Sequence, residues 1–344
     1  MNESMVHPSI VGGPCAWLAR DQRELSDWEY RLSTSEVAEL ADAARRIYRS
    51  VTHPVRWSDL TVEDFPLPAI AATLRSILRE LFEGRGFALI RGVPVDELSV
   101  PEAELLLWGI GLNMGTPIPQ NAAGDLVVHV RDQGRRFSDP SVRAYETSEA
   151  LEYHTDSGDI AGLLCLKPAK RGGVSTIASS TAIHDEMVRR RPDLAQLLYE
   201  PWTRVTLLGG EILHKPICER LNDRVYFGYG RMYLERASAQ RPEIPPLTAD
   251  QIAALDLFDE LANHPDFRLD MDFSPGDIQF LNNYTILHAR TEYEDWPEPE
   301  RKRDLCRLWI VRKDLSLPGS FQAHGIVSRS VAFEPRTEAS PVSN

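Results

Sequence analysis

The chain has 344 residues, of which 42% are hydrophobic and 26% are charged, a composition typical of a soluble globular protein. A formal net charge of -13 and the absence of a basic run longer than three residues argue against nucleic acid or an anionic membrane as a partner. No apolar stretch approaches about 18 residues, so no membrane span is expected. Four widely separated cysteines and no signal-peptide pattern predict reduced thiols in a cytoplasmic protein.

The chain is predicted to be mainly helical up to about position 111. Residues 1–30 show no clear period and are expected to pack as an irregular arm over the main body. Ser99, Pro101 and Glu102 supply the N-cap, the first-turn proline and the capping-box acid of a helix. The elements predicted in this part are, in chain order, helices over 34–48 and 67–83, a buried strand over 87–92 and a helix over 99–111.

From there the pattern changes to short β-like runs separated by Gly, Pro, Asp and Ser, which is typical of an antiparallel sheet or barrel. The elements predicted here are, in chain order, strands over 126–130 and 162–166, helices over 181–190 and 194–199, strands over 204–208 and 225–229, a helix over 248–263, a tight turn over 274–277 and a strand over 304–311. The last dozen residues, rich in Ser, Pro and Glu, are expected to be disordered.

An imidazole and a carboxylate stand two residues apart in the segment LEYHTD. Residues i and i+2 of a strand project from the same face, so His154 and Asp156 can reach one metal ion. A third ligand is available in His288, which follows the tight turn over 274–277. Two histidines and one carboxylate form the facial triad of non-haem Fe(II) oxygenases.

Two other histidines compete as ligands, and an HxD pattern alone is weak evidence. A single histidine in a chain that has nine is more often a surface or hydrogen-bonded core residue. His129 and His184 are the competing candidates, but neither has a carboxylate two positions away on a strand, and His184 falls in a predicted helix. The turn after Asp156 and the strand-like run after His288 favour the triad.

Three protein ligands leave open positions that suit a bidentate 2-oxo acid and dioxygen. The far carboxylate of that acid needs a buried cation, and a planar guanidinium meets a carboxylate with two parallel hydrogen bonds. Arg307, which lies among apolar residues of the last strand, is the first candidate, although an outward-facing strand position explains it equally well. Arg303 is the second candidate, and Ser175 is expected to supply a supporting hydrogen bond.

Together these residues resemble the TauD/TfdA-like family (taurine dioxygenase, clavaminate synthase-like) of Fe(II)/2-oxoglutarate-dependent dioxygenases. The resemblance covers roughly residues 85–315. It lies in YHTD at 153–156, LLCLKPAKRGGVSTIASS at 163–180, DFSPGDIQFLNNYTILH at 272–288 and RKRDLCRLWI at 301–310, with GTP at 115–117 and HVRD at 129–132. The family's Gly-Gly-Asp-Thr is here Gly-Gly-Val-Ser, which keeps a hydroxyl and drops an acid.

The resemblance implies a mainly β fold with flanking helices and a double-stranded β-helix core (jelly roll, cupin-like). It places His154, Asp156 and His288 on the iron ligands, Arg307 on the 2-oxoglutarate clamp and Ser175 on a position where the family often has threonine. The organisation it implies is an N-terminal arm with helices over 1–84, a catalytic domain with helical insertions over 85–315 and a tail over 316–344.

The activity implied is decarboxylation of 2-oxoglutarate to succinate, with Fe(II) and O2, coupled to hydroxylation of an unactivated C-H bond. The expected partner is a small, polar, amino-acid- or carboxylate-like substrate, and a homo-oligomer is left open. Desaturation, cyclisation or C-heteroatom cleavage is the alternative outcome, and a metal-binding jelly-roll sensor or binding module is the non-enzymatic alternative. The residues expected to place the substrate are Gln120, Asn121, Arg131, Tyr153, Asp159, Tyr229 and Tyr284.

Overall fold

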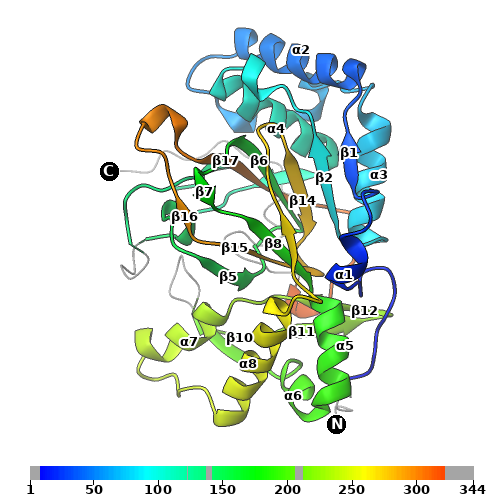
Figure 1. Cartoon of the computed structure of the whole chain (residues 1–344), viewed down its shortest axis with the longest axis vertical. Helices are drawn as coiled ribbons and strands as arrows, with labels where there is room; N and C mark the ends of the chain where they lie inside the picture. The colour runs from blue at the N-terminus through cyan, green and yellow to red at the C-terminus, as the bar shows by residue number, and fades with distance from the viewer. Residues whose placement is uncertain (1–7, 122, 137–141, 206–211, 322–344) are drawn as a thin grey trace.

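The computed structural model of the chain describes residues 8–121, 123–136, 142–205 and 212–321. Two β-sheets lie between two groups of helices, so the main body has four layers (Figure 1). The large sheet has seven strands, in the order β1 (Glu29–Arg31), β2 (Phe87–Arg91), β14 (Ile278–Asn282), β6 (Ile160–Lys167), β17 (Asp304–Val311) and β3 (Thr116–Ile118), with β4 (Val127–Val130) also paired to β17. The small sheet has the order β13 (Leu269–Met271), β8 (Ser175–Ser179), β15 (Ile286–Arg290) and β5 (Leu151–His154).

In two stretches of the chain, from β4 to β8 and from β13 to β17, the strands of these two sheets alternate between the large and the small sheet. The chain passes from β5 in the small sheet to β6 in the large one, and later from β14 in the large sheet to β15 in the small one. Leu89 and Leu281 of the large sheet share a buried cluster with Ile177 and Met271 of the small sheet. The inner faces of the sheets therefore pack against each other, as in a β-sandwich.

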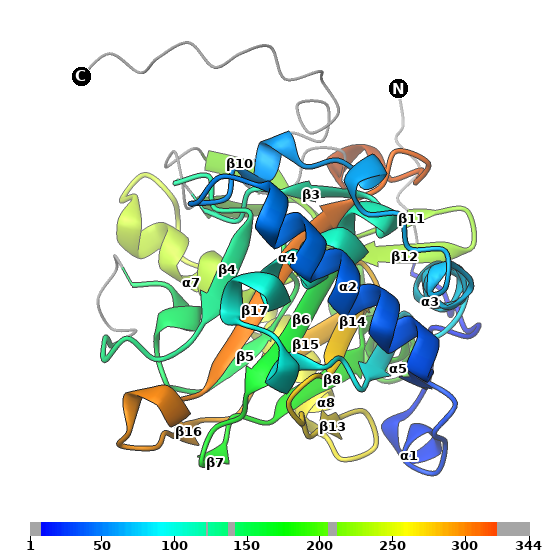
Figure 2. The same cartoon turned by 90° about the horizontal axis from the view of Figure 1, so that it is seen from above.

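Helices cover both outer faces of this pair of sheets. On the large sheet lie α2 (Thr34–Ser50), α3 (Ala71–Phe82) and α4 (Val100–Met114), and Figure 2 shows α2 and α4 crossing over its strands. On the small sheet lie α5 (Ser180–Arg190), α6 (Pro192–Leu197) and α8 (Ala249–Asn263). Among the described residues, every helix is too short or too polar to cross a bilayer.

The period of two along each strand separates core from site. In β17, Cys306, Leu308 and Ile310 point outward into the helix-facing core, so the alternate positions, Arg307 and Trp309, face inward. The same parity turns Tyr153 of β5 outward, toward α5 and α8, and its neighbour His154 inward. The inner faces therefore carry the polar residues that matter for function.

The six helices expected from apolar spacing and capping are confirmed to within a few residues. Glu102 accepts hydrogen bonds from the backbone N–H and the hydroxyl of Ser99, both at 2.8 Å, as the capping box predicted. The expectation of an irregular arm over 1–30 was incomplete, because α1 (Ala19–Gln22) and β1 lie there and β1 gains its hydrogen bonds only by pairing with β2. A further helix, α7 (Arg231–Gln240), was missed because its sequence carries few apolar residues.

The remaining elements are short. They are β9 (Trp202–Val205) paired with β10 (Ile212–Lys215), β11 (Cys218–Leu221) with β12 (Arg224–Phe227), and β7 (Arg171–Gly172) with β16 (Tyr293–Glu294). The strand expected over 204–208 is described only as far as Val205, and positions 206–208 lie outside the described residues. The tail expected to be disordered also lies outside them.

Candidate metal and cosubstrate site

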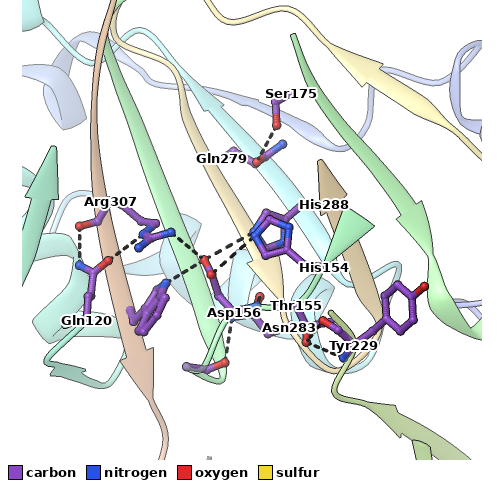
Figure 3. Close-up of polar contacts among 12 residues, drawn as sticks. Gln120, His154, Thr155, Asp156, Ser175, Tyr229, Gln279, Asn283, His288 and Arg307 are labelled. Atoms are coloured by element: carbon purple, nitrogen blue, oxygen red, sulfur yellow. Dashed lines mark hydrogen bonds and ion pairs between the residues drawn. The ribbon is translucent and has the colours of Figure 1, made fainter. Parts of the chain in front are cut away.

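The two histidines of the expected metal site lie opposite each other on neighbouring strands. His154, the last residue of β5, pairs in register with His288 of β15, so both side chains leave the same face. Asp156 follows two residues later, and one ligand atom from each of the three side chains lies within 4.8 Å of the others. Figure 3 shows the imidazoles and the carboxylate directed toward one another. The structure thus brings the expected iron ligands together.

The turn that carries Asp156 is held from two sides. The backbone N–H of Thr155 donates to the carbonyl of Tyr229 at 2.9 Å, and the hydroxyl of Thr155 accepts from the N–H of Tyr229 at 3.0 Å. On the other side, Oδ1 of Asn283 accepts from the N–H of Asp156 at 3.3 Å, and its amide donates to the carbonyl of Gly158 at 2.8 Å. These backbone contacts fix the position from which the carboxylate projects.

The protonation states of His154 and Asp156 suit metal binding. Nδ1 of His154 donates to the carbonyl of Glu152 at 2.9 Å, so Nε2 carries the lone pair. Burial and the neighbouring His288 lower the pKa of His154 to about 4, which keeps the imidazole neutral at pH 7. Burial tends to raise the pKa of Asp156, but the charge of Arg307 and the contact with His288 outweigh it and hold that pKa well below its usual range. The site therefore offers a neutral imidazole at His154 and an ionised carboxylate at Asp156, with the His288 imidazole beside them.

A metal ion fits this donor set. Nε2 of His288 lies 3.5 Å from Oδ2 of Asp156, and Nε2 of His154 lies 3.8 Å from Oδ1. Nδ1 of His288 is buried without a hydrogen-bond partner among the described residues, so this imidazole lacks a polar contact that a buried histidine normally makes. Two imidazole nitrogens and one carboxylate oxygen are the ligand types that bind Fe(II) in non-haem oxygenases.

The competing histidines are engaged elsewhere. Nδ1 and Nε2 of His129 each lie 2.7 Å from a carboxylate oxygen, of Asp304 and Glu104 respectively, so both nitrogens are used in a charged network between β4 and α4. Cys306 lies 3.9 Å from the same ring, which groups these side chains as a second cluster of ligand-type residues. His184 is fully buried beside α6, where Nε2 meets the hydroxyl of Tyr199 at 2.9 Å. Neither histidine joins the triad.

Arg307 lies next to the triad. Its Nη1 lies 3.5 Å from Oδ2 of Asp156, and its Nε donates to Oε1 of Gln120 at 2.8 Å. The amide of Gln120 donates to the carbonyls of Arg307 and Leu126, at 2.8 Å and 2.9 Å. The outward-facing alternative for Arg307 is therefore wrong, because this guanidinium is held on the inner face (Figure 3).

Arg303 lies at a different corner of the inner face, together with Arg290. The two guanidinium carbons lie 4.9 Å and 5.0 Å from the ring centroid of Tyr293, and the two arginines are only 4% and 7% exposed. Nε and Nη1 of Arg290 are buried without a hydrogen-bond partner among the described residues. Burial lowers the pKa of Arg303, and burial together with the charge of Arg303 lowers the pKa of Arg290 to about 10. This corner therefore favours an anion.

Ser175 borders that corner. It pairs in register with Arg290, and its hydroxyl donates to Oε1 of Gln279 at 3.2 Å. Gly173, two residues earlier, has a φ of +68°, and a Cβ there would lie 3.1 Å from Nε of Arg303. The glycine lets the chain turn while leaving room for the guanidinium.

Of the residues expected to place the substrate, Gln120 contacts Arg307 and the others make their contacts elsewhere. The amide of Asn121 donates to Asp125 at 2.8 Å, and Arg131 is largely exposed beside Asp304. Tyr153 packs under the helices of the small sheet. The hydroxyl of Tyr229 donates to Asp259 at 2.6 Å, and the hydroxyl of Tyr284 donates to Asp159 at 2.6 Å. These contacts give no support to a role in substrate placement for the latter six.

Three residues of the site were missed from the sequence. Trp309 and Arg290 lie two positions after Arg307 and His288 on the same strands, so the i+2 rule that paired His154 with Asp156 also applied to them. Asn283 had no such signal, because its contacts with the HxD turn depend on how the β14–β15 connection folds back.

Comparison with known proteins gives one family. A sequence model of the family described as "Taurine catabolism dioxygenase TauD, TfdA family" matches residues 50–309. FR-33289 synthase of Streptomyces rubellomurinus (strain ATCC 31215) is 32% identical over 332 residues, which cover 91% of this chain and 94% of that protein.

Solved structures agree on the fold. The chain is similar to an asparagine oxygenase in complex with Fe(II), 2S,3S-3-hydroxyasparagine and succinate, with a TM-score of 0.63, 16% identity and coverage of 82% of this chain and 93% of the other. It is also similar to the non-heme iron oxygenase OrfP in complex with Fe and alpha-ketoglutaric acid, with a TM-score of 0.62, 18% identity and coverage of 83% and 94%. The chain thus belongs to the TauD, TfdA family and is a non-haem Fe(II)/2-oxoglutarate-dependent dioxygenase.

Proposed function

We propose that this protein hydroxylates an unactivated C-H bond of a small anionic substrate, of the amino-acid or carboxylate kind. The balanced reaction consumes 2-oxoglutarate, O2 and the substrate R–H and yields succinate, CO2 and R–OH. The observation that carries the proposal is that one ligand atom each of His154, Asp156 and His288 lies within 4.8 Å of the others. The buried pair of Arg290 and Arg303, whose positive charges favour an anion, lies on the same inner face.

The core that holds this site is proposed to be a double-stranded β-helix. Support comes from the alternation of strands between two facing sheets from β4 to β8 and from β13 to β17. The candidate ligands lie at the end of β5, in the turn after it and on β15, and the arginine pair lies on β15 and beside β17. This arrangement brings residues from distant parts of the chain together between the two sheets.

The three ligands would hold Fe(II), which, when bound, supplies the centre where O2 and 2-oxoglutarate react to oxidise the substrate. The contribution of the protein is placement and charge. Asp156 stays ionised and His154 stays neutral at pH 7, so both are ready to bind a cation. Hydrogen bonds of Thr155 and Asn283 fix the turn that follows His154 and carries Asp156. They therefore limit the movement of the Asp156 carboxylate relative to His154.

The far carboxylate of 2-oxoglutarate is proposed to sit against Arg303 and Arg290. Two methylene groups separate that carboxylate from the metal-chelating end, so its partner lies away from the metal ligands. Arg307 stands 3.5 Å from Asp156, next to the metal, whereas Nε and Nη1 of Arg290 are buried and free of partners among the described residues. The arginine pair therefore suits the far carboxylate better than Arg307, and Ser175 borders the same corner.

Arg307 is then available for the substrate. Its charge beside the metal site suits a carboxylate, sulfonate or similar anionic group on the molecule to be oxidised. The family is named for taurine, which carries a sulfonate, and one structural neighbour is an asparagine oxygenase, whose substrate carries a carboxylate. An anion held at Arg307 would place the rest of a small substrate close to the metal.

The test begins without oxygen. Addition of Fe(II) and then 2-oxoglutarate to the purified protein is expected to produce a weak visible charge-transfer band. Oxygen uptake coupled to succinate is then screened over small amino acids, carboxylates and sulfonates, with product mass read for the gain of one oxygen atom. Asp156→Ala is the negative control, and Glu152→Ala, which changes an exposed side chain of the same strand, is the matched positive control. Absence of the band and of succinate from the wild-type protein would reject the proposal.

A further inference from the structure

The carboxylate of Asp156 meets several nitrogen atoms on one of its two oxygens. The indole Nε1 of Trp309 donates to Oδ2 at 2.8 Å, and Nη1 of Arg307 lies 3.5 Å from the same oxygen. Nε2 of His288 also lies 3.5 Å from Oδ2, whereas Oδ1 faces His154, whose Nε2 lies 3.8 Å away. The two oxygens of this carboxylate are therefore in different surroundings, and the short bond to Oδ2 comes from Trp309.

The indole of Trp309 is packed between apolar side chains and a guanidinium. Trp309 is 6% exposed and packs in a small cluster with Ile118, Ala161 and Val311, apart from the main cores. The guanidinium carbon of Arg307 lies 4.7 Å from the indole ring.

The chain just after Asp156 also lies close against Trp309. A Cβ added at Gly158 would lie 3.0 Å from Cβ of Trp309 and 3.2 Å from the carbonyl oxygen of Ile160. Any larger residue at position 158 would push the HxD turn away from β17. The sequence thus keeps the turn and the indole in contact, which holds the N–H donor against the carboxylate.

We propose that Trp309 is a positioning residue that restricts Asp156 to binding the metal through Oδ1 alone. The inference rests on the proposed function, because it assumes that His154, Asp156 and His288 hold Fe(II). A carboxylate can bind a metal through one oxygen or both. An oxygen that accepts a short N–H bond is held in that direction, so the metal takes the other oxygen and a coordination position stays open for the small molecules of the reaction.

The alternative is that Trp309 only fills space in the core. Two variants separate these roles. Trp309→Phe keeps an aromatic ring and removes the N–H donor. Trp309→His returns a donor, because Nε2 of histidine occupies the same place in its five-membered ring as Nε1 does in indole. A space-filling role predicts that histidine is no better than phenylalanine.

The experiment measures binding of Co(II), which substitutes for Fe(II) and has a visible spectrum that reports coordination number. We expect Trp309→Phe to raise the Kd for Co(II) at least about tenfold and to change the visible band of the bound ion, because Asp156 becomes free to bind through both oxygens. Trp309→His is expected to recover most of the affinity and the wild-type band. Turnover is not needed for either readout.

Trp202→Phe is the matched control. Its indole Nε1 also makes a buried hydrogen bond, to the carbonyl of Leu197 at 2.8 Å, but it lies in the core between the small sheet and its helices. Its Co(II) affinity is expected to equal that of the wild type.

Two results would overturn the inference: an unchanged Kd and visible band in Trp309→Phe, or a Kd for Co(II) in Trp309→His as high as that in Trp309→Phe. If Trp309→Phe does not fold, a changed Co(II) band in folded Trp309→His overturns it equally. Failure of the wild type to bind Co(II) would instead reject the proposed function.

Discussion

Arg307 and Gln120 hold each other through two hydrogen bonds. Nε of Arg307 donates to Oε1 of Gln120, and Nε2 of Gln120 donates to the backbone carbonyl of Arg307, both at 2.8 Å. Gln120 is 3% exposed, so neither bond competes with solvent. The pair keeps the guanidinium of Arg307 beside Asp156, whereas Arg303 lies against Tyr293.

Loss of the Arg303 charge should weaken cosubstrate binding. Arg303→Gln is expected to raise the Kd for 2-oxoglutarate at least about tenfold, because a charge-assisted bond to a buried carboxylate contributes about 1.5 to 3 kcal/mol. The measurement is titration of the Fe(II) protein with 2-oxoglutarate without oxygen. Arg301→Gln is the control, since Arg301 is about half exposed and stacks on Trp296 outside the site.

Arg307→Gln gives the complementary result. We expect its Kd for 2-oxoglutarate to change less than that of Arg303→Gln, while succinate formation no longer responds to substrates found in the screen. The reason is that Gln120 holds Arg307 beside Asp156, where it is proposed to bind the anionic group of the substrate and not the far carboxylate of 2-oxoglutarate. A large rise in the Kd in Arg307→Gln, with none in Arg303→Gln, would return the clamp to Arg307, as the resemblance first implied.

Removal of the Asp156 carboxylate should abolish metal binding and turnover together. Asp156→Ala leaves two imidazoles, and the Arg307 charge beside them then repels a cation instead of being balanced. Calorimetric titration with Fe(II) under nitrogen measures the first effect, and succinate release in air measures the second. Full activity in this variant would reject the facial triad.

His129 should stabilise the fold in a pH-dependent way. Hydrogen bonding to Asp304, with contributions from Cys306 and Glu104, raises the pKa of His129 to about 12. A raised folded-state pKa stabilises fully below the unfolded value of about 6.5, and this contribution is lost as the pH rises toward 12. His129→Gln is therefore expected to lower the free energy of unfolding by about 1.5 to 3 kcal/mol near neutral pH, and by less at pH 10.

Urea unfolding at several pH values measures that difference. His264→Gln is the control, because His264 is about half exposed and its ion pair with Asp266 is long, at 3.9 Å. Its effect on the free energy of unfolding is expected to stay small at every pH. A wild-type to His129→Gln difference that grows with pH would contradict the prediction.

Tyr284 should matter for stability more than for substrate. Its hydroxyl donates to the buried carboxylate of Asp159 at 2.6 Å, and Oδ2 of Asp159 accepts from the backbone N–H of Arg312 at 2.6 Å. Tyr284→Phe is expected to lower the free energy of unfolding by about 1 to 3 kcal/mol and leave 2-oxoglutarate binding unchanged. Unaltered stability with lost turnover would instead support the substrate role expected from the sequence.

Local patterns in the sequence were enough to predict most helices and the three candidate ligands that the structure brings together. The i+2 spacing predicted that His154 and Asp156 lie close together, although Asp156 lies in the turn after β5 and not on the strand itself. Capping signals such as Ser99 with Glu102 act within one turn, so they predict a helix start without knowledge of the rest of the fold. The TauD/TfdA-like resemblance then named the chemistry.

Tertiary structure decided which residues these arginine and tyrosine side chains contact. Arg303 and Arg307 are four residues apart in one run, yet one lies against Tyr293 and the other against Gln120, because each direction depends on what the facing sheet and loops present. The partners of Tyr229, Tyr284 and Trp309 come from distant segments that only folding brings near. Side-chain identity and period are local properties, whereas a partner across a sheet is not. For that reason the sequence alone determined which residues are candidate ligands, and only the tertiary structure determined what surrounds them.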